Sequence, residues 1–455
     1  MTTGSPGERG APPAPDRGYA SHLERVMAAH AEALQRTDAD VVVIDAGAPR
    51  NHFRDDHAPP FRSNPLFEHW LPVNDQAEHM LVWRPGVRPV LLYLQPADYW
   101  HLPPAAPEGH WVQHIDVRIL RTPEALVDEL ATLVQGRSLY LGSRGEQFGN
   151  LVGAINAAAA IDYLEFQRAV KTPWELDCMR AATARAVPGH QAAAAAFAAG
   201  GSEYEIHLAY LRASQQTERD LPYGNIVALN EHCGVLHYQH QELLAPPQRH
   251  AFLIDAGARA NGYAADITRT YAAAPGLFLD VLLALDAAQR RMVDDIRVGM
   301  PYLALHERAH QLIAQVLCDA GVLTCDAAAA FDRGLTRTFL PHGLGHLLGL
   351  QTHDAGGQLA DDRGTRRPPP AIYPALRNTR TIETGQVFTI EPGIYFIPML
   401  LDELRAQPDA AVNWQAIDAL LPCGGIRIED NVHVLSDGVE NLTREAFAAA
   451  AHVPS

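Results

Sequence analysis

The stretch L-I-D-A-G-A-R-A-N-G-Y-A-A-D-I-T-R-T-Y, residues 253–271, constrains the fold more than any other part of the chain. Two apolar, β-prone runs flank an Asn-Gly pair, which predicts a β-hairpin with its turn near Asn261 and Gly262. Each run carries one acid in otherwise apolar company, and a tight hairpin centred just before Asn261 would place Asp255 and Asp266 opposite one another. Facing carboxylates destabilise a strand pair, so the sequence requires something that compensates their charge.

The size and charge of the chain exclude several classes of protein. A length of 455 residues is too long for one core and predicts two domains. The net charge of -17 and the lack of a basic stripe argue against nucleic-acid binding. Five scattered cysteines without a C-x-x-C pair are typical of reduced thiols in a cytoplasm. The longest apolar run, Ala192–Ala199, is too short to span a bilayer. We therefore expect a cytoplasmic protein with neither nucleic-acid nor membrane partners.

The pattern of apolar residues predicts an α/β (α+β) protein built from two domains. Helix-like and strand-like runs alternate up to about Tyr163, for example the strand V-V-V-I-D at Val41–Asp45. The sequence Thr172-Pro173-Trp174-Glu175 then supplies a capping box that opens a new helix. The predicted segments are a disordered tail at 1–18, an N-terminal α/β domain at 19–168, a second domain at 169–445 and a C-terminal tail at 446–455.

Two further segments need a separate interpretation. The connection from His353 to Thr381 is dense in Gly, Pro and charge, which predicts a lid or a disordered loop. Residues 306–310 read H-E-x-x-H, a zinc-protease motif. The same two histidines also share a helical stripe with Leu303 and Leu317, so buried core histidines are the competing interpretation.

More acids lie inside apolar, strand-like runs of the second half. V-F-T-I-E-P-G ends its run on Glu391, and G-G-I-R-I-E-D places Arg427 and Glu429 on one strand face. Three histidines follow one another in the segment between the hairpin and these strands: His342, His346 and His353. Buried carboxylates need compensation, and few buried cations besides Arg427 are evident in this half.

Divalent metal ions would resolve the excess of negative charge. Four carboxylates carry about -4 between them, which two divalent ions would neutralise. Oxygen ligands with one imidazole form a hard donor set. Such a set suits manganese or other hard cations, in contrast to a zinc site rich in thiolates. Two ions bridged by carboxylates can hold a hydroxide, as metal-assisted hydrolases do.

The order of the motifs resembles a known family. D-A-G, A-A-D-I-T-R-T, P-H-G-L-G-H, T-I-E-P-G and G-I-R-I-E-D are similar to the metal signature of the "pita-bread" metallopeptidases, which include methionine aminopeptidase, aminopeptidase P and prolidase. P-Y-G-N-I-V-A-L-N-E-H-C-G-V-L-H-Y, D-D-H-A-P-P-F-R-S-N-P-L-F and P-A-D-Y-W-H extend the similarity to the bacterial Xaa-Pro dipeptidases (prolidases). The resemblance implies an N-terminal α/β domain followed by a C-terminal pita-bread metallopeptidase domain.

The resemblance also implies a metal centre and a reaction. Its two divalent ions would be manganese, with cobalt or zinc as alternatives, and a metal-bridged hydroxide would attack the X-Pro carbonyl. Glu391 would in addition shuttle the proton. The implied metal ligands are Asp255, Asp266, His346, Glu391 and Glu429, of which Asp266 and Glu429 would bridge both ions.

Further residues would contact the dipeptide. The implied catalytic histidines around the substrate are His237, His342 and His353. Arg427 would either anchor the proline carboxylate or act as partner of the ligand acids, and both interpretations stay open. Tyr223 and Asp56 would lie near the free amine, with Asp56 donated by a neighbouring subunit of a homodimer.

Several functions are compatible with such a site. The first is hydrolysis of Xaa-Pro dipeptides, with organophosphorus esters as a side activity that the resemblance suggests. The alternative is aminopeptidase P-like removal of the N-terminal residue from longer X-Pro peptides. A creatinase-like hydrolase or binding module without metal is a third hypothesis, although all five implied ligands are present. The resemblance places the H-E-x-x-H on a helix away from the metals.

Overall fold

The structure, a computed structural model, describes residues 18–451. The predicted N-terminal tail therefore lies outside the described residues except for Gly18, as do the last four residues of the predicted C-terminal tail. The remainder of that C-terminal segment is not a tail. Helix α13 (Leu442–Ala451) continues past residue 445, and Phe447 lies against the guanidinium of Arg269 and the ring of His190. An alanine-rich run is strongly helix-forming, which explains this correction.

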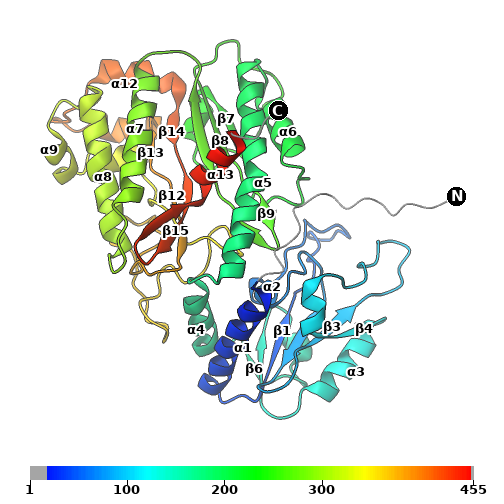
Figure 1. The fold of residues 1–455 in the computed structure, drawn as a ribbon. Helices are drawn as coiled ribbons and strands as arrows, with labels where there is room; N and C mark the ends of the chain where they lie inside the picture. The colour runs from blue at the N-terminus through cyan, green and yellow to red at the C-terminus, as the bar shows by residue number, and fades with distance from the viewer. Residues whose placement is uncertain (1–17, 452–455) are drawn as a thin grey trace.

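The N-terminal half contains one mixed sheet of six strands in the order β4-β3-β2-β1-β5-β6 (Figure 1). Val41–Asp45 forms β1 as predicted, and it is buried on both faces in the interior of the sheet. The other strands are β2 (Met80–Trp83), β3 (Val90–Leu94), β4 (Asp116–Leu120), β5 (Ser138–Leu141) and β6 (Ala154–Ile155). The helices are α1 (Tyr19–Arg36), α2 (Pro65–Trp70), α3 (Pro123–Leu133) and α4 (Ala158–Arg168), with 3-10 turns η1 (His110–His114) and η2 (Gly145–Phe148).

Alternation along β1 divides the core of this half into two layers. Val42 and Ile44 pack on the side of α1, whereas Val41 and Val43 pack on the side of α3. Successive residues of a strand point to opposite faces, so a continuous Val/Ile run fills both layers. The predicted α/β character of this half is confirmed.

The second half begins at the predicted capping box. Thr172 Oγ1 accepts from the Glu175 N–H, and Glu175 Oε2 accepts from the Thr172 N–H at 2.7 Å. This box opens α5 (Pro173–Ala198), which is followed by α6 (Glu203–Ala213). The prediction of a helix start at this place is confirmed.

The remaining elements of the described chain build four small sheets and a helical layer. The strands are β7 (Ile226–Leu229), β8 (Ala251–Asp255), β9 (Arg259–Ala260), β10 (Tyr263–Ala264), β11 (Thr268–Ala272), β12 (Val387–Ile390), β13 (Gly393–Tyr395), β14 (Gly425–Arg427), β15 (Asp430–Leu435) and β16 (Gly438–Asn441). The helices are α7 (Leu277–Asp294), α8 (Tyr302–Asp319), α9 (Ala327–Asp332), α10 (Thr336–Phe339), α11 (Pro398–Arg405) and α12 (Trp414–Leu420), with η3 (Asn230–Gly234) and η4 (Leu421–Cys423). Helices α7 and α8 lie side by side along one flank (Figure 1).

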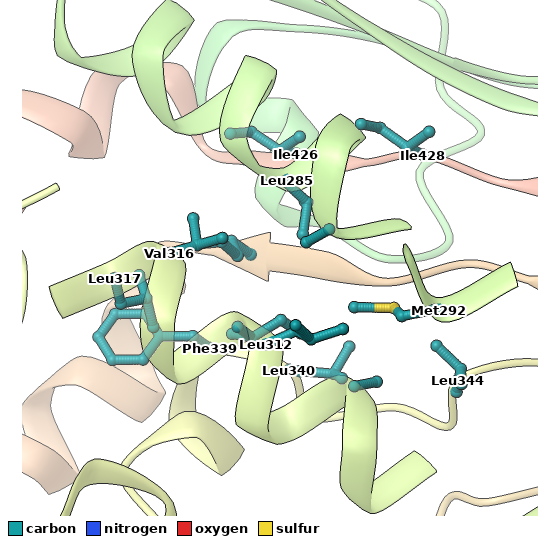
Figure 2. Packing of buried hydrophobic residues seen from close by; sticks show 14 of the residues in the cluster. Leu285, Met292, Leu312, Val316, Leu317, Phe339, Leu340, Leu344, Ile426 and Ile428 are labelled. Carbon is teal, nitrogen blue, oxygen red and sulfur yellow. The ribbon is translucent and has the colours of Figure 1, made fainter. Parts of the chain in front are cut away.

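A large apolar core joins this helical layer to the strands. Figure 2 shows Leu285 and Met292 of α7 and Leu312 of α8 in the same cluster as Ile426 and Ile428. Because these two isoleucines face the core, strand alternation turns the residues beside them, Arg427 and Glu429, to the other side.

The hairpin that opened the sequence analysis forms, but in a different register. Asn261 and Gly262 both have positive φ (49° and 87°), as a two-residue turn requires. The hairpin is therefore centred between these two residues, and Asp255 pairs with Thr268, not with Asp266. The predicted direct opposition of the two acids is wrong. They still share one face, since Asp266 lies two positions along the strand from Thr268.

The tip of this hairpin is held by the N-terminal half of the chain. Arg259 forms ion pairs with Glu68 at 3.2 Å and with Asp75 at 3.0 Å. Within the second half, Tyr263 donates a hydrogen bond to Glu175 at the start of α5 at 2.9 Å. The strands that carry the acids are thus anchored across the junction between the two halves.

The Gly/Pro-rich connection after His353 is ordered by ion pairs. It contains neither helix nor strand between His353 and Thr381. Asp354 pairs with Arg168 at 2.6 Å and with Lys171 at 2.8 Å, and Asp362 pairs with Arg36 at 2.7 Å. These contacts fasten the connection to α1, α4 and the start of α5. Among residues 18–451, no helix has the length and apolar character needed to cross a membrane.

Candidate metal centre

A cavity of about 260 Å³ lies within the second half of the chain and collects most of the predicted site. It is lined by nine predicted residues: His237, Asp255, Asp266, His342, His346, His353, Glu391, Arg427 and Glu429. Leu236, Pro341, Ala375 and Arg377 also line it, and the sequence analysis did not single these out. Ala375 and Arg377 come from the long connection, which therefore forms a wall of the cavity.

Each acid sits where a strand begins or ends. Asp255 closes β8, Glu391 follows β12, and Glu429 precedes β15. Asp266 lies before β11, where the Asn431 side chain accepts from its N–H at 3.0 Å. At the end of a strand the backbone is still held by the sheet. The four carboxylates, which come from separate parts of the sequence, can therefore converge on one place.

The imidazole of His346 points into this group of acids. Its Nε2 lies 3.4 Å from Asp266 Oδ2 and 3.6 Å from Glu391 Oε1. Its Nδ1 lies 3.0 Å from the Leu347 carbonyl, to which it donates, and that leaves the Nε2 lone pair facing the acids. One ligand atom from each of Asp266, His346 and Glu429 lies within 4.8 Å of the others.

The electrostatics of the acids show that they need cations. Burial, reinforced by the charge of Asp266, raises the pKa of Asp255 to about 6. Burial likewise raises the pKa of Glu391 to about 7 and raises the pKa of Glu429 well above its ordinary value. Burial also opposes ionisation of Asp266, but the hydrogen bonds from His346 and Tyr223 and the charge of His346 together outweigh it, so the pKa of that carboxyl is lowered.

This donor set fits two divalent ions. Carboxylate oxygens and a single neutral imidazole are hard ligands, and the raised pKa values mark charge that the protein alone leaves uncompensated. Asp255, Asp266, His346, Glu391 and Glu429 are the residues that would hold such ions.

Arg427 contacts the acids directly. Its guanidinium lies 2.8 Å from Asp255 Oδ2, 2.9 Å from the Tyr395 hydroxyl and 3.1 Å from Thr268 Oγ1. Thr268 in turn donates to Glu429 Oε2 at 2.7 Å. These are the contacts of a charge partner for the ligand acids, one of the two interpretations left open by the sequence.

The other histidines surround the acids in neutral form. His342 Nε2 lies 2.9 Å from the Tyr395 hydroxyl, and its Nδ1 lies 3.8 Å from Glu391. The ring of His353 lies edge-on to that of His346, with centroids 4.4 Å apart. Burial lowers the pKa of His342 to about 3 and that of His353 to about 4, so both offer neutral imidazoles at neutral pH.

Neither Tyr223 nor Asp56 lines the first cavity. Tyr223 lines the adjoining cavity, where its hydroxyl lies 2.8 Å from Asp255 Oδ1 and also hydrogen-bonds to Asp266, and its contact with the substrate stays a prediction. Asp56 is exposed and lines neither of the two cavities. Its donation to the site of a second subunit stays a prediction.

A second cavity of about 610 Å³ adjoins the first and was missed by the sequence analysis. The two share His237, Asp255, Asp266 and His353, while Arg62 and Glu68 of the N-terminal half line the far side. The only sequence signal for this cavity was the F-R-S-N-P-L-F motif. That this motif lies near the hairpin is visible only in the fold.

The H-E-x-x-H histidines are core residues of α8. His306 and His310 are buried, their Nε2 atoms lie 3.3 Å apart, and His310 Nδ1 lies 3.0 Å from Thr336 Oγ1. Both rings pack on Tyr373. Neither histidine lines the 260 Å³ cavity, which favours the structural interpretation of the motif.

The raised pKa values predict how the metal-free protein responds to pH. A carboxyl with a folded pKa above its unfolded value of about 4 binds its proton more tightly in the folded state. These carboxyls therefore contribute a loss of stability to the metal-free protein as pH rises from about 4 to about 7, whereas buried histidines such as His342 and His353, whose pKa values are lowered, contribute a gain over the same range. Added Mn²⁺ should stabilise the protein increasingly over this range, because metal ligands must be deprotonated. Thermal unfolding of chelator-treated protein across pH measures this, with and without Mn²⁺ and with Glu391→Gln, which should gain stability relative to the parent as pH rises; parallel curves with and without Mn²⁺ would contradict it.

Comparison with known proteins agrees with this geometry. The family model "Metallopeptidase family M24" matches residues 177–436, and "Xaa-Pro dipeptidase, N-terminal domain" matches residues 17–166. An Xaa-Pro dipeptidase of Xanthomonas euvesicatoria is 49% identical over 95% of this chain and 98% of its own. Xaa-Pro dipeptidase 2 of Idiomarina loihiensis is 43% identical over 94% of this chain and 98% of its own.

Solved structures show the same fold at lower identity. The aminopeptidase PepP of Pseudomonas aeruginosa has a TM-score of 0.71 and 22% identity, covering 97% of this chain and 100% of its own. The zinc-substituted Escherichia coli aminopeptidase P has a TM-score of 0.68 and 22% identity, covering 96% and 99%. The predicted order of an α/β domain and a pita-bread metallopeptidase domain is confirmed. The chain belongs to metallopeptidase family M24 and, within it, to the Xaa-Pro dipeptidases.

Proposed function

We propose that this protein hydrolyses Xaa-Pro dipeptides with the help of two divalent metal ions. The observation that carries the proposal is the convergence of four acids and His346 on one cavity of about 260 Å³. Relatives 49% identical over nearly the full length are Xaa-Pro dipeptidases, which supports the same substrate class.

When bound, the two ions supply Lewis acidity and make water a nucleophile at neutral pH. The protein's own groups do the rest. Glu391 lines the cavity beside His346 and can take a proton and return it to the leaving proline nitrogen. His237 lines the cavity and can donate a hydrogen bond to the carbonyl oxygen as it gains charge, whereas the Nδ1–H of His342 is already donated to the Gly343 carbonyl at 2.7 Å.

The walls of the cavity suit a short substrate that ends in proline. Leu236 and Pro341 offer apolar surface for the pyrrolidine ring, and Arg377 offers a guanidinium for its carboxylate. A volume of about 260 Å³ is at the small end of ligand sites, which leaves little room beyond proline. The larger adjoining cavity can accept the side chain of the preceding residue.

The proposal is tested by comparing Ala-Pro with Ala-Pro-Ala as substrates of the Mn²⁺-loaded enzyme. We expect kcat/KM for the dipeptide to exceed that for the tripeptide by at least about 100-fold, roughly 2.7 kcal/mol, because a residue after proline would meet the wall formed by the long connection. Equal or faster cleavage of the tripeptide would support aminopeptidase P-like activity instead.

The proposal also covers the metal, the cellular location, the oligomeric state and a side activity. Manganese is proposed from the hard donor set, with cobalt and zinc as alternatives. A cytoplasmic location is supported by five cysteines that are all free. A homodimer is supported by the exposed side chains of Phe53, Tyr99, Trp100 and Leu102, which suit an interface that also brings in Asp56. Hydrolysis of organophosphorus esters remains a prediction from the family resemblance.

A further inference from the structure

Three ligand-type side chains meet at the junction of the two domains, apart from the metal centre. His22 comes from α1, His69 from α2 and Glu175 from the first turn of α5. They are 1%, 8% and 2% exposed, and none of them lines the 260 Å³ cavity. One ligand atom from each lies within 4.8 Å of the others.

The distances between these atoms are close to those in a metal site. His22 Nδ1 lies 3.7 Å from Glu175 Oε2, and His69 Nε2 lies 3.5 Å from Glu175 Oε1. Zinc bonds of about 2.0–2.1 Å in tetrahedral geometry separate neighbouring ligand atoms by roughly 3.3 Å. Small side-chain rotations would therefore bring all three onto one ion.

His22 already has the orientation of a ligand. Its Nε2–H donates to the carbonyl of His69 at 2.8 Å, so the lone pair is on Nδ1, which accepts from the Thr172 hydroxyl at 2.9 Å and lies 3.7 Å from Glu175 Oε2. Burial lowers the pKa of His22 to about 4, so the ring is neutral at neutral pH. Metal-bound histidines are typically fixed in this way by a carbonyl on the far nitrogen.

Glu175 retains the lone pairs that a metal would need. Its Oε1 accepts from the Tyr263 hydroxyl at 2.9 Å and its Oε2 from the Thr172 N–H at 2.7 Å. Each carboxylate oxygen has two lone pairs, so one remains on each. Both existing contacts are neutral donors, and they hold the carboxylate toward the two imidazoles.

The Glu175 carboxylate is held in its ionised form at this place. Burial opposes its ionisation, but His69, His22 and Lys171 outweigh this and hold its pKa well below the ordinary value. On His69, Nδ1 is buried without a hydrogen-bond partner in the described part of the chain, and Nε2 lies 3.5 Å from Glu175 Oε1. Because metal ligands must be deprotonated, an ionised carboxylate beside two imidazoles is ready to take a cation.

We propose that His22, His69 and Glu175 bind one divalent cation of the zinc class that fastens the N-terminal domain to the catalytic domain. Two nitrogens and one oxygen suit zinc, and the Thr172 hydroxyl, 2.9 Å from His22 Nδ1, or a water completes the fourth position. Because the ligands come from three helices, the ion is structural and binds as the domains come together.

The test counts zinc in full-length protein whose metal centre has been removed by Asp266→Asn and Glu429→Gln. After equilibration with Zn²⁺ and gel filtration, we expect about one equivalent by mass spectrometry, against less than about 0.1 when His69→Ala is added. His30→Gln is the control, because His30 lies in α1 with His22 and is buried, but its nitrogens face Val26 and Trp70. This control should retain the zinc.

Anomalous diffraction at the zinc edge supplies a measurement that needs no variant. A peak between His22, His69 and Glu175 in crystals of the unaltered enzyme grown with Zn²⁺ would support the site. Zinc at the metal centre with no peak at the junction would overturn the proposal, and so would an equivalent of zinc that survives His69→Ala. These readouts do not depend on peptide hydrolysis.

Discussion

The Asp266→Asn variant is expected to lose about four orders of magnitude in kcat/KM on Ala-Pro, on the order of 5 kcal/mol of transition-state stabilisation. Asp266 lies closest to His346 among the four acids and belongs to the group of three whose ligand atoms lie within 4.8 Å. Removing its charge should therefore release metal as well as activity. Metal content after gel filtration and initial rates at saturating Mn²⁺ measure the two effects.

The Glu429→Gln variant tests the same centre, but it is expected to raise the stability of the metal-free protein. The pKa of Glu429 is raised well above its ordinary value by burial and by the neighbouring acids, so its charge destabilises the metal-free fold. The glutamine variant should lose activity to a similar extent, yet its metal-free form should unfold at a higher temperature than the metal-free parent. Asp286→Asn is the control, because Asp286 of α7 pairs with Arg444 of α13 and does not line the cavity. Full activity in Asp266→Asn would refute the assignment of the metal centre.

Arg427→Ala is expected to lower kcat/KM by about 100- to 1,000-fold, roughly 3–4 kcal/mol, because it leaves Asp255 without its partner inside the protein. The guanidinium holds Asp255, Tyr395 and Thr268 together, and Thr268 holds Glu429. We therefore expect weaker metal binding together with a fall in kcat.

Arg377→Ala serves as the matched comparison for Arg427→Ala. Arg377 lines the cavity from the long connection, so its loss should mainly raise KM for the dipeptide and leave metal affinity unchanged. Steady-state kinetics on Ala-Pro, with Mn²⁺ titrations of each variant, separate the two roles. If Arg427→Ala changed only KM, Arg427 would be the carboxylate anchor and not the charge partner.

Much of this architecture follows from local chemistry that the sequence displays. The turn at Asn261-Gly262, the capping box at Thr172 and Glu175, and the buried strand Val41–Asp45 each depend on a few neighbouring residues. The acids were recognisable because carboxylates rarely lie in apolar strands without a reason. The register of the hairpin was misjudged because the turn was centred one position too early.

The remaining features depend on residues that are distant in sequence. No local pattern indicates that Tyr223 bonds two acids, that Arg377 closes the cavity, or that His22 and His69 face Glu175. Their neighbourhoods arise when separate helices and connections pack together. The end of the described chain was misjudged for a different reason, since the helix-forming tendency of the alanine run 448–451 is a local signal that was not weighed.

The ion pairs of Arg259 with Glu68 and Asp75 make the hairpin a mechanical connection between the domains. Its tip is held by these ion pairs to the N-terminal domain, and its base carries Asp255 and Asp266. A rotation of one domain against the other must therefore either break the ion pairs or displace the carboxylates. Motion between the domains and retention of the cations are consequently linked, so a substitution at Glu68 should increase the rate at which the ions dissociate.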